Sequence, residues 1–240
     1  MFEKFGEAFS LLFKHIWLFS AIVLTVWLPG NVLVAIVTDQ AGKDDFMAVF
    51  RTIMVIEGVF SPIYVGALLY TLSRIKSGQV VTYREAMAVG VKKWFALFAT
   101  RFIAGIFIVL GLILLVIPGI ILALLFALID SAVILENKGI FDSLKRSIAL
   151  TAGRRWEILG AILLLFLGLI VLSALVYLPF GVIEALELSV NLAPVQIVVD
   201  CAMSVVALVI QIVLFLYYWE AVGGQPGSGA SATGEQKVAA

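Results

Sequence analysis

The chain has 240 residues, of which 63% are hydrophobic and only 13% are charged, whereas soluble domains average about 45–50% apolar and about 25% charged residues. This composition predicts an integral membrane protein, and the balance of sixteen Lys and Arg against sixteen Asp and Glu argues against a nucleic-acid partner. A single cysteine, Cys201, excludes an intrachain disulfide, and with a single histidine, His15, it argues against a His/Cys metal site, so we expect no cofactor.

The first predicted element is an amphipathic helix at the N-terminus. Its apolar face consists of Phe2, Phe5, Phe9, Phe13 and Ile16. Glu3 and Glu7 stand where a cleavable signal peptide would be basic, and no small-residue cleavage site closes the apolar run that follows. We therefore expect that run to be retained as a membrane anchor.

Five apolar blocks are candidates for membrane spans. They cover residues 16–38, 52–73, 94–135, 157–180 and 195–219. Because a helix rises about 1.5 Å per residue, about 20 residues cross a hydrocarbon core of about 30 Å. The third block is about twice that length, and its centre holds Pro118 and Gly119, a pair that can close a tight turn between two helices.

Flanking charge decides whether the third block is a hairpin or one kinked span. Segments 74–93 and 138–156 are both rich in Lys and Arg, which marks both as cytoplasmic, so a hairpin turn at Pro118 and Gly119 is required. Of the sixteen Lys and Arg, twelve fall in predicted cytoplasmic segments and two in predicted outer segments. The sequence thus predicts an all-α integral membrane fold of six transmembrane helices in three hairpins. We expect a multi-pass protein of the cytoplasmic (inner) membrane, with both termini cytoplasmic.

Three segments of the chain share one pattern. FEKFGEAFSLLFKHIWLF, TYREAMAVGVKKWFALF and IFDSLKRSIALTAGRRWEIL each run from an amphipathic stretch through basic residues to Trp17, Trp94 or Trp156. One interpretation is that each hairpin is preceded by a cytoplasmic amphipathic helix in the membrane interface, anchored by its tryptophan. The other is that any cytoplasmic connector is basic and flanked by tryptophan, without internal duplication.

These patterns set the predicted domain organisation. Residues 1–222 form a single transmembrane domain, with units at about 1–76, 77–137 and 138–222. After Trp219 the composition changes to small and polar residues, so 223–240 is predicted to be a disordered C-terminal tail.

The basic residues near the ends of the second and third segments are candidate lipid-binding residues. Each Lys or Arg near an anionic surface contributes about 1 kcal/mol of attraction. We therefore predict that anionic headgroups are bound by Lys92, Lys93, Lys145, Arg146, Arg154 and Arg155.

The run IPGIILALLFALIDSAVILENKGIFDSLKRSIALTAGRRWEILG, residues 117–160, carries a family pattern. In that pattern Pro-Gly leads into a helix ending in Val-x-x-Glu, followed by Ala/Ser-Leu-Lys-Arg-Ser and Thr-x-Gly-x-x-Trp. The chain resembles the bacterial YciC-type inner-membrane proteins and the membrane domain that accompanies some glycerophosphoryl diester phosphodiesterases. The matching positions are Pro118, Gly119, Glu136, Ser143, Leu144, Lys145, Arg146, Ser147, Thr151, Gly153 and Trp156.

The resemblance implies a polytopic cytoplasmic-membrane protein whose biochemical role is poorly defined and which is sometimes linked to envelope integrity. It implies no phosphodiesterase activity. The chain has no soluble catalytic barrel and no paired acidic and His residues for metal-assisted hydrolysis.

Two charged residues fall inside the third apolar block. Arg101 lies seven residues after Trp94, and Asp130 lies six residues before Glu136, which places both about 10 Å from the cytoplasmic interface on the two arms of the hairpin. We predict an intramembrane Arg101–Asp130 ion pair. One interpretation is that it fastens the two helices, and the other is a role in transport.

Polar residues also form one stripe on each of two other spans. Glu57, Ser61 and Tyr64 share a face of the second span, and Asp200, Ser204 and Gln211 share a face of the last. Together they are candidates to line an outward-facing cavity. The alternative is that Glu57 and Asp200 lie shallow enough to reach interfacial water.

No sequence feature favours an enzyme, because the chain has no HExxH, P-loop or GxSxG motif, and we predict no catalytic residue. We favour a non-enzymatic protein that organises or stabilises the membrane and whose basic cytoplasmic face binds anionic lipid or an unidentified protein partner. The alternative is a transporter of a small solute or lipid, with Glu57 and Asp200 in its cavity. A water-accessible cavity that reaches both carboxylates supports the transporter, and a sealed interior supports the scaffold.

Overall fold

The structure, a computed structural model, describes residues 2–41, 46–186 and 192–224. The described chain is helical, without strands. In chain order the elements are α1 (Phe2–Lys14), α2 (Ile16–Ala41), α3 (Phe46–Val55), the π-helix η1 (Ile56–Phe60), α4 (Ser61–Lys76), α5 (Tyr83–Leu114), α6 (Val116–Leu125), α7 (Ile129–Leu135), α8 (Ile140–Thr151), α9 (Arg155–Ala185) and α10 (Ala193–Ala221).

Within the described residues, six helical stretches are long and apolar enough to cross a membrane. They are Ile16–Thr38, Met47–Lys76, Tyr83–Leu114, Val116–Leu135, Arg155–Ile183 and Ala193–Ala221. The second joins α3, η1 and α4, and the fourth joins α6 and α7. The predicted all-α membrane class with six candidate spans is therefore confirmed.

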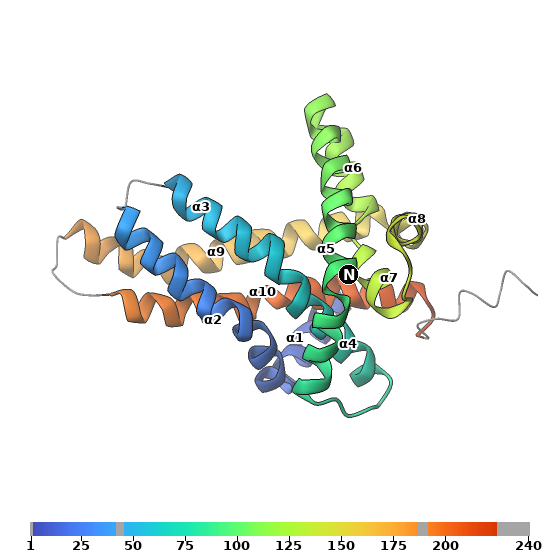
Figure 1. Cartoon of the computed structure of the whole chain (residues 1–240), viewed down its shortest axis with the longest axis horizontal. Coiled ribbons are helices and arrows are strands. Elements are labelled where there is room, and N and C mark those ends of the chain that lie inside the picture. The colour runs from blue at the N-terminus through green and yellow to red at the C-terminus, as the bar shows by residue number, and fades with distance from the viewer. Residues whose placement is uncertain (1, 42–45, 187–191, 225–240) are drawn as a thin grey trace, which may run out of the picture.

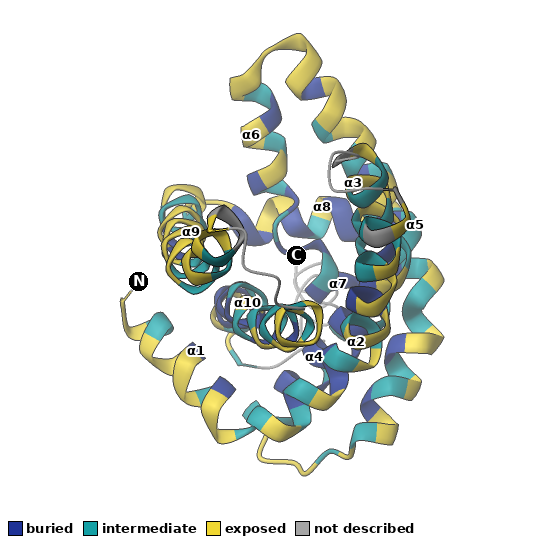
Figure 2. Cartoon of the chain, turned by 90° about the vertical axis from the view of Figure 1, so that its left-hand side faces the viewer, coloured by how far each residue is buried: buried dark blue, intermediate teal, exposed yellow. Residues whose placement is uncertain are grey.

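The six spans do not run parallel to one another. Helices α9 and α10 lie along the long axis with α2 and α3 oblique beside them, whereas α5 and α6 stand across that direction (Figure 1). In the view along the long axis, α9 and α10 are seen nearly end-on and α6 from the side (Figure 2). Buried residues gather where α4 and α10 meet the other helices, including Leu68 and Ile212, which are fully buried.

The bend between α5 and α6 falls at Leu115, three residues before the predicted turn. Leu115 is extended, with φ −164° and ψ 145°, and it starts α6, so Pro118 and Gly119 lie inside the first turns of that helix. Proline is tolerated there because the first-turn amide lacks a helical acceptor. Gly119 serves the packing instead, because its backbone nitrogen and Cα lie 3.2 and 3.1 Å from a Cβ built at Gly111 on α5.

The three predicted surface helices differ in the structure. The first and third are separate helices, α1 and α8, which end before His15 and Ala152 respectively. The second is not separate: α5 begins with the Thr82–Glu85 capping box and continues without interruption to Leu114. No proline interrupts residues 83–114 and no polar turn divides them, so helical hydrogen bonding continues.

The predicted tail at 223–240 lies outside the described residues except for Gly223 and Gly224. These two end α10, and the amide of Gly224 donates to the carbonyl of Trp219 at 3.0 Å. The C-terminal helix is thus closed by residues that were assigned to the tail.

Candidate functional site

A cavity of about 530 Å³ lies between α2, α3, η1, α4, α9 and α10. Each long helix contributes residues at helical spacing, so each turns one face to the cavity. These residues are Trp27, Asn31 and Val34 from α2, Leu169, Ser173 and Tyr177 from α9, and Asp200, Met203, Ser204, Ala207, Leu208, Ile210 and Gln211 from α10. Ile53, Glu57 and Tyr64 complete the wall from the second span.

The structure brings together five of the six residues predicted to line a cavity. Glu57, Tyr64, Asp200, Ser204 and Gln211 all border it. Ser61 does not. It is 1% exposed, and its hydroxyl accepts a hydrogen bond from Arg101 instead. The two polar stripes therefore face one common space.

Glu57 lies in a π-helical turn, and such turns within α-helices are frequent at functional sites. The Tyr64 hydroxyl donates to the two carboxylate oxygens of Glu57 at 3.2 and 3.3 Å. From outside the cavity, the indole N–H of Trp94 donates to the carbonyl of Val59 at 2.5 Å. The π-helix is thus fixed by one contact on each side, and its carboxylate is held toward the cavity.

Asp200 occupies the opposite wall, on α10. Its carboxylate accepts a hydrogen bond from the Tyr177 hydroxyl of α9, and its backbone carbonyl accepts one from Ser204 at 2.8 Å. Next to it, the side-chain amide of Asn31 donates to the sulfur of Cys201 at 3.6 Å, which joins α2 to α10. Each carboxylate of the cavity therefore accepts a hydrogen bond from one tyrosine, which is Tyr64 of the same span for Glu57 and Tyr177 of α9 for Asp200.

Arg101 and Asp130 form a bidentate ion pair. Nε of Arg101 donates to Oδ1 of Asp130 at 2.9 Å, and Nη2 donates to Oδ2 at 2.6 Å. The third donor, Nη1, reaches the Ser61 hydroxyl at 2.7 Å. One guanidinium therefore joins α5 to α7 and to the start of α4, directly after the turn that carries Glu57.

The residues of the family pattern build a joint between α7, α8 and α10. Glu136, at the end of α7, has a side chain that is only 6% exposed, and Arg146 of α8 donates to both of its carboxylate oxygens at 2.9 Å. The Tyr218 hydroxyl of α10 donates to the same carboxylate at 3.2 Å. A buried carboxylate that is paired in this way fixes three helices to one another.

Ser147 extends this joint to the break between α6 and α7. Its hydroxyl donates to the carbonyl of Leu125 at 2.7 Å and accepts from the amide of Leu128 at 3.2 Å. Both backbone groups lie where the helix is interrupted, so Ser147 satisfies hydrogen bonds that the interruption leaves open. The side chain of Ser143 does the same for the carbonyl of Lys138 at 3.3 Å.

The six predicted headgroup-binding residues divide into two groups. Lys93 donates to Asn137, Arg146 pairs with Glu136, and Arg154 pairs with Glu220 at 2.8 Å. The other three are exposed, and their side chains have no hydrogen bond or ion pair within the described residues: Lys92, Lys145 and Arg155. Only this second group is free to meet a ligand outside the protein.

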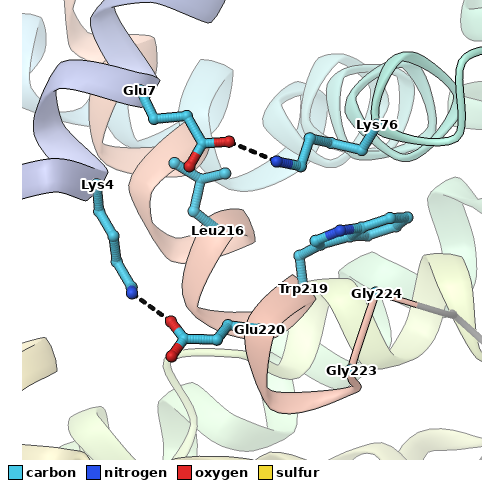
Figure 3. A pocket seen from close by; sticks show the side chains of 8 residues that line it. All are labelled: Lys4, Glu7, Lys76, Leu216, Trp219, Glu220, Gly223 and Gly224. Atoms are coloured by element: carbon cyan, nitrogen blue, oxygen red, sulfur yellow. Dashed lines mark hydrogen bonds and ion pairs between the residues drawn. The ribbon is translucent and has the colours of Figure 1, made fainter.

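The charged end of the molecule joins the first and last helices. Lys4 of α1 pairs with Glu220 of α10, and Glu7 pairs with Lys76 at the end of α4 (Figure 3). A shallow pocket of about 310 Å³ lies between them, and each of its four charges has an opposite partner. These pairs are structural, and they place the two ends of the described chain together.

The three predicted interfacial tryptophans lie in different settings. Trp17 and Trp156 are 88% and 84% exposed, as an anchor in surrounding lipid requires. Trp94 is half-buried and uses its N–H inside the protein, on the π-helix.

Sequence reasoning missed Asn31 and Tyr177 as cavity residues. Asn31 could have been found from the sequence, because it is a polar residue in the middle of the first apolar block. Nothing in the sequence around Tyr177, apart from its hydroxyl group, marks it as a cavity residue. In the described part of the chain, no three His, Cys, Asp or Glu side chains gather as metal ligands.

The chain is similar to proteins of one family. A model of the family UPF0259, described as an uncharacterised protein family, matches residues 38–178. A "UPF0259 membrane protein" of Serratia proteamaculans (strain 568) is 29% identical over 154 residues, which cover 64% of this chain and 58% of that protein. The alignment thus spans less than two thirds of the relative's length. No solved structure matches the chain significantly. The matched range includes Glu57, Arg101, Asp130 and the Glu136–Arg146 ion pair, while Asp200 lies beyond it.

Proposed function

Because the chain belongs to UPF0259, an uncharacterised family of membrane proteins, we propose its function from its own cavity: it binds a small solute within the membrane and carries it across. One observation carries this proposal. A cavity of about 530 Å³ reaches both Glu57 and Asp200, which lie on separate helices. Intramembrane carboxylates are expensive and normally mark a pathway or a site, and a scaffold alone has no use for two of them around a void.

The test is the accessibility of the cavity to water. In a Cys201→Ser background, we expect Ser173→Cys on α9 to react with a charged, membrane-impermeant thiol reagent applied to the outside of cells. Leu175→Cys is the matched control, because Leu175 is 65% exposed on another face of the same helix, which we expect to face lipid. If neither cysteine reacts while both react after unfolding, the interior is sealed and the transporter proposal is wrong.

A second candidate function, the binding of anionic lipid at the cytoplasmic face, is supported by Lys92, Lys145 and Arg155. These three have exposed side chains that the described protein leaves unpaired, and the exposed Trp17 and Trp156 suit an interfacial position. Native mass spectrometry is expected to find co-purified phosphatidylglycerol or cardiolipin, reduced when all three become Gln. Arg51→Gln, on α3, is the control. Equal lipid in the triple variant and in the wild type contradicts this function.

We also propose on which side of the membrane the termini lie and to which proteins the chain is related. Lys4 and Glu220 join the first and last helices, which favours termini on one side, and the distribution of Lys and Arg favours the cytoplasmic side of an inner membrane. Within UPF0259, the positions from Pro118 to Trp156 favour a relation to the YciC-type proteins, with a non-enzymatic role. The resemblance to the membrane domain of some phosphodiesterases extends to that domain only.

A further inference from the structure

We infer that the cavity takes a lipophilic organic cation, an apolar amine or quaternary onium ion, whose charge is held by Glu57 and Asp200 and by the aromatic rings around them. The inference rests on the proposed function and names the chemical class of its solute. Its support comes from the charge, the rings and the apolar surface of the cavity, and from the helix that separates the cavity from lipid.

The charge of the cavity is negative. Two carboxylates border it, and none of its described lining residues is Lys, Arg or His. Arg101 does not line the cavity, and it donates two of its hydrogen bonds to Asp130. A carboxylate in surroundings of low polarity attracts a cation more strongly than a carboxylate in bulk water does. The same field excludes anions.

Three aromatic rings border the two carboxylates. Trp27, Tyr64 and Tyr177 come from α2, α4 and α9, so they approach the cavity from different sides. The two tyrosines are oriented by their hydroxyl groups, which donate to Glu57 and to Asp200. Aromatic faces beside a carboxylate are the surroundings in which proteins bind ammonium and other onium centres, through cation–π attraction.

The rest of the wall is apolar, and it selects against a hydrated metal ion. Val34, Ile53, Leu169, Met203 and Ile210 add apolar surface to the cavity. Its volume of about 530 Å³ falls within the range of about 300–1,000 Å³ typical of sites for small organic ligands. Mg²⁺ and Ca²⁺ need six or more oxygen ligands at short distance, whereas a cation with apolar substituents fills this space and buries its own apolar surface.

The position of α9 points to entry from the bilayer. Three residues on one face of α9, Leu169, Ser173 and Tyr177, line the cavity, while Leu167, Leu175 and Leu178 are exposed on other faces. A single helix therefore separates this side of the cavity from the exterior of the protein. It is also the least buried of the six spans, with 17% of its most apolar window inside the protein. A ligand dissolved in the bilayer needs only a displacement of α9 to enter.

Binding of radiolabelled tetraphenylphosphonium to the purified full chain in dodecyl maltoside, with empty micelles as background, tests the inference. We expect saturable binding of one cation per chain. Unlabelled tetrapentylammonium should displace the probe, and triphenylphosphine oxide, which has a similar shape but no charge, should not. Displacement by both to the same extent overturns the inference, because shape and not charge would then be recognised.

Variants assign the binding to the cavity. Glu57→Gln with Asp200→Asn should weaken binding by about tenfold or more, which corresponds to at least about 1.4 kcal/mol. Asp142→Asn, an exposed carboxylate on α8, is the matched control and should leave the affinity unchanged. Ser173→Trp fills the cavity while both charges stay, and it should abolish binding, so it decides the matter if the double variant does not fold. Unchanged affinity in a folded double variant, or in Ser173→Trp, contradicts the inference.

The two proposals can fail separately. If Ser173→Cys reacts with the impermeant reagent but tetraphenylphosphonium shows no saturable binding, the cavity serves another class of solute and the cation inference is wrong. If Ser173→Cys does not react and no cation binds, the transport proposal is wrong as well.

Discussion

Arg101 shows how one side chain can hold a membrane interior together. A guanidinium has five N–H donors in a fixed plane. Here all three of its nitrogens donate hydrogen bonds within the protein, two to Asp130 and one to Ser61. The pair was predictable because its members lie at equal depth on the two arms of one apolar block. Ser61 was not predicted as a partner of Arg101, because it shares a helix face with Glu57 and was therefore expected to line the cavity.

Removal of one member of this pair should be more damaging than removal of both. Asp130→Asn leaves Arg101 charged without its carboxylate. Breaking a fully buried pair typically destabilises by about 3–5 kcal/mol, and this pair, whose side chains are 25% and 16% exposed, should lose less than that. Asp130→Asn with Arg101→Gln removes both charges and should restore a large part of that loss. Thermal unfolding of the purified variants measures the difference.

The result that contradicts this pairing is an equal loss of stability in the single and the double variant. Asp142→Asn again serves as a control for the loss of a carboxylate, and it should unfold at the temperature of the wild type. A control that is itself destabilised would show a general effect of charge on the protein.

At the scale of elements, the sequence defined the membrane helices better than their ends. Apolar length located five blocks, because any helix that crosses about 30 Å needs about 20 apolar residues. The double length of the third block, together with the basic segments on both of its sides, indicated the sixth span. The bend at Leu115 was misplaced to Pro118 and Gly119, since both residue types suit a turn and a first helical turn equally. The continuity of α5 was missed because amphipathicity before Trp94 does not reveal whether the helix stops there.

Close packing of α4 on α5 gives a prediction at this scale. A Cβ at Gly90 would lie 2.2 Å from the carbonyl oxygen of Ile63, so Gly90→Ala must push the two helices apart. We expect a loss of about 1–3 kcal/mol in stability, as for other overpacked sites. Gly105→Ala is the matched control on the same helix, because nothing lies within 4 Å of its Cβ. Equal stability of the two variants, measured by thermal unfolding, contradicts the packing observed here.

At the scale of the whole molecule, the ion pairs gather the two chain ends while the spans diverge. Lys4, Arg154 and Glu220 connect α1, α10 and the residue before α9 at the charged end, whereas α5 and α6 stand across α9 and α10 (Figure 1). Sequence patterns could not predict this divergence. Hydropathy reports that a helix is apolar, and its tilt is set by packing against neighbours that are distant in sequence.

The proposed orientation predicts which surface residues a reagent reaches in intact cells. In the Cys201→Ser background, Gln40→Cys at the end of α2 should react with an impermeant thiol reagent. Ser77→Cys, which follows α4 and is exposed at the charged end, should react only after the cells are permeabilised. The opposite pattern would reverse the proposed topology.

Helix α7 has a carboxylate near each end, and that feature gives it a mechanical role. Asp130 is tied to Arg101, and Glu136, six residues later and about 9 Å along the axis, is tied to Arg146. An ion pair near each end thus connects α7 to α5 and to α8. A displacement of α8 would push α7 and, through Arg101 and Ser61, the turn that carries Glu57. Spin labels on α8 and on α4, each measured against a reference label on α10, should then change their distances together, and a change for α8 alone would rule out the transmission.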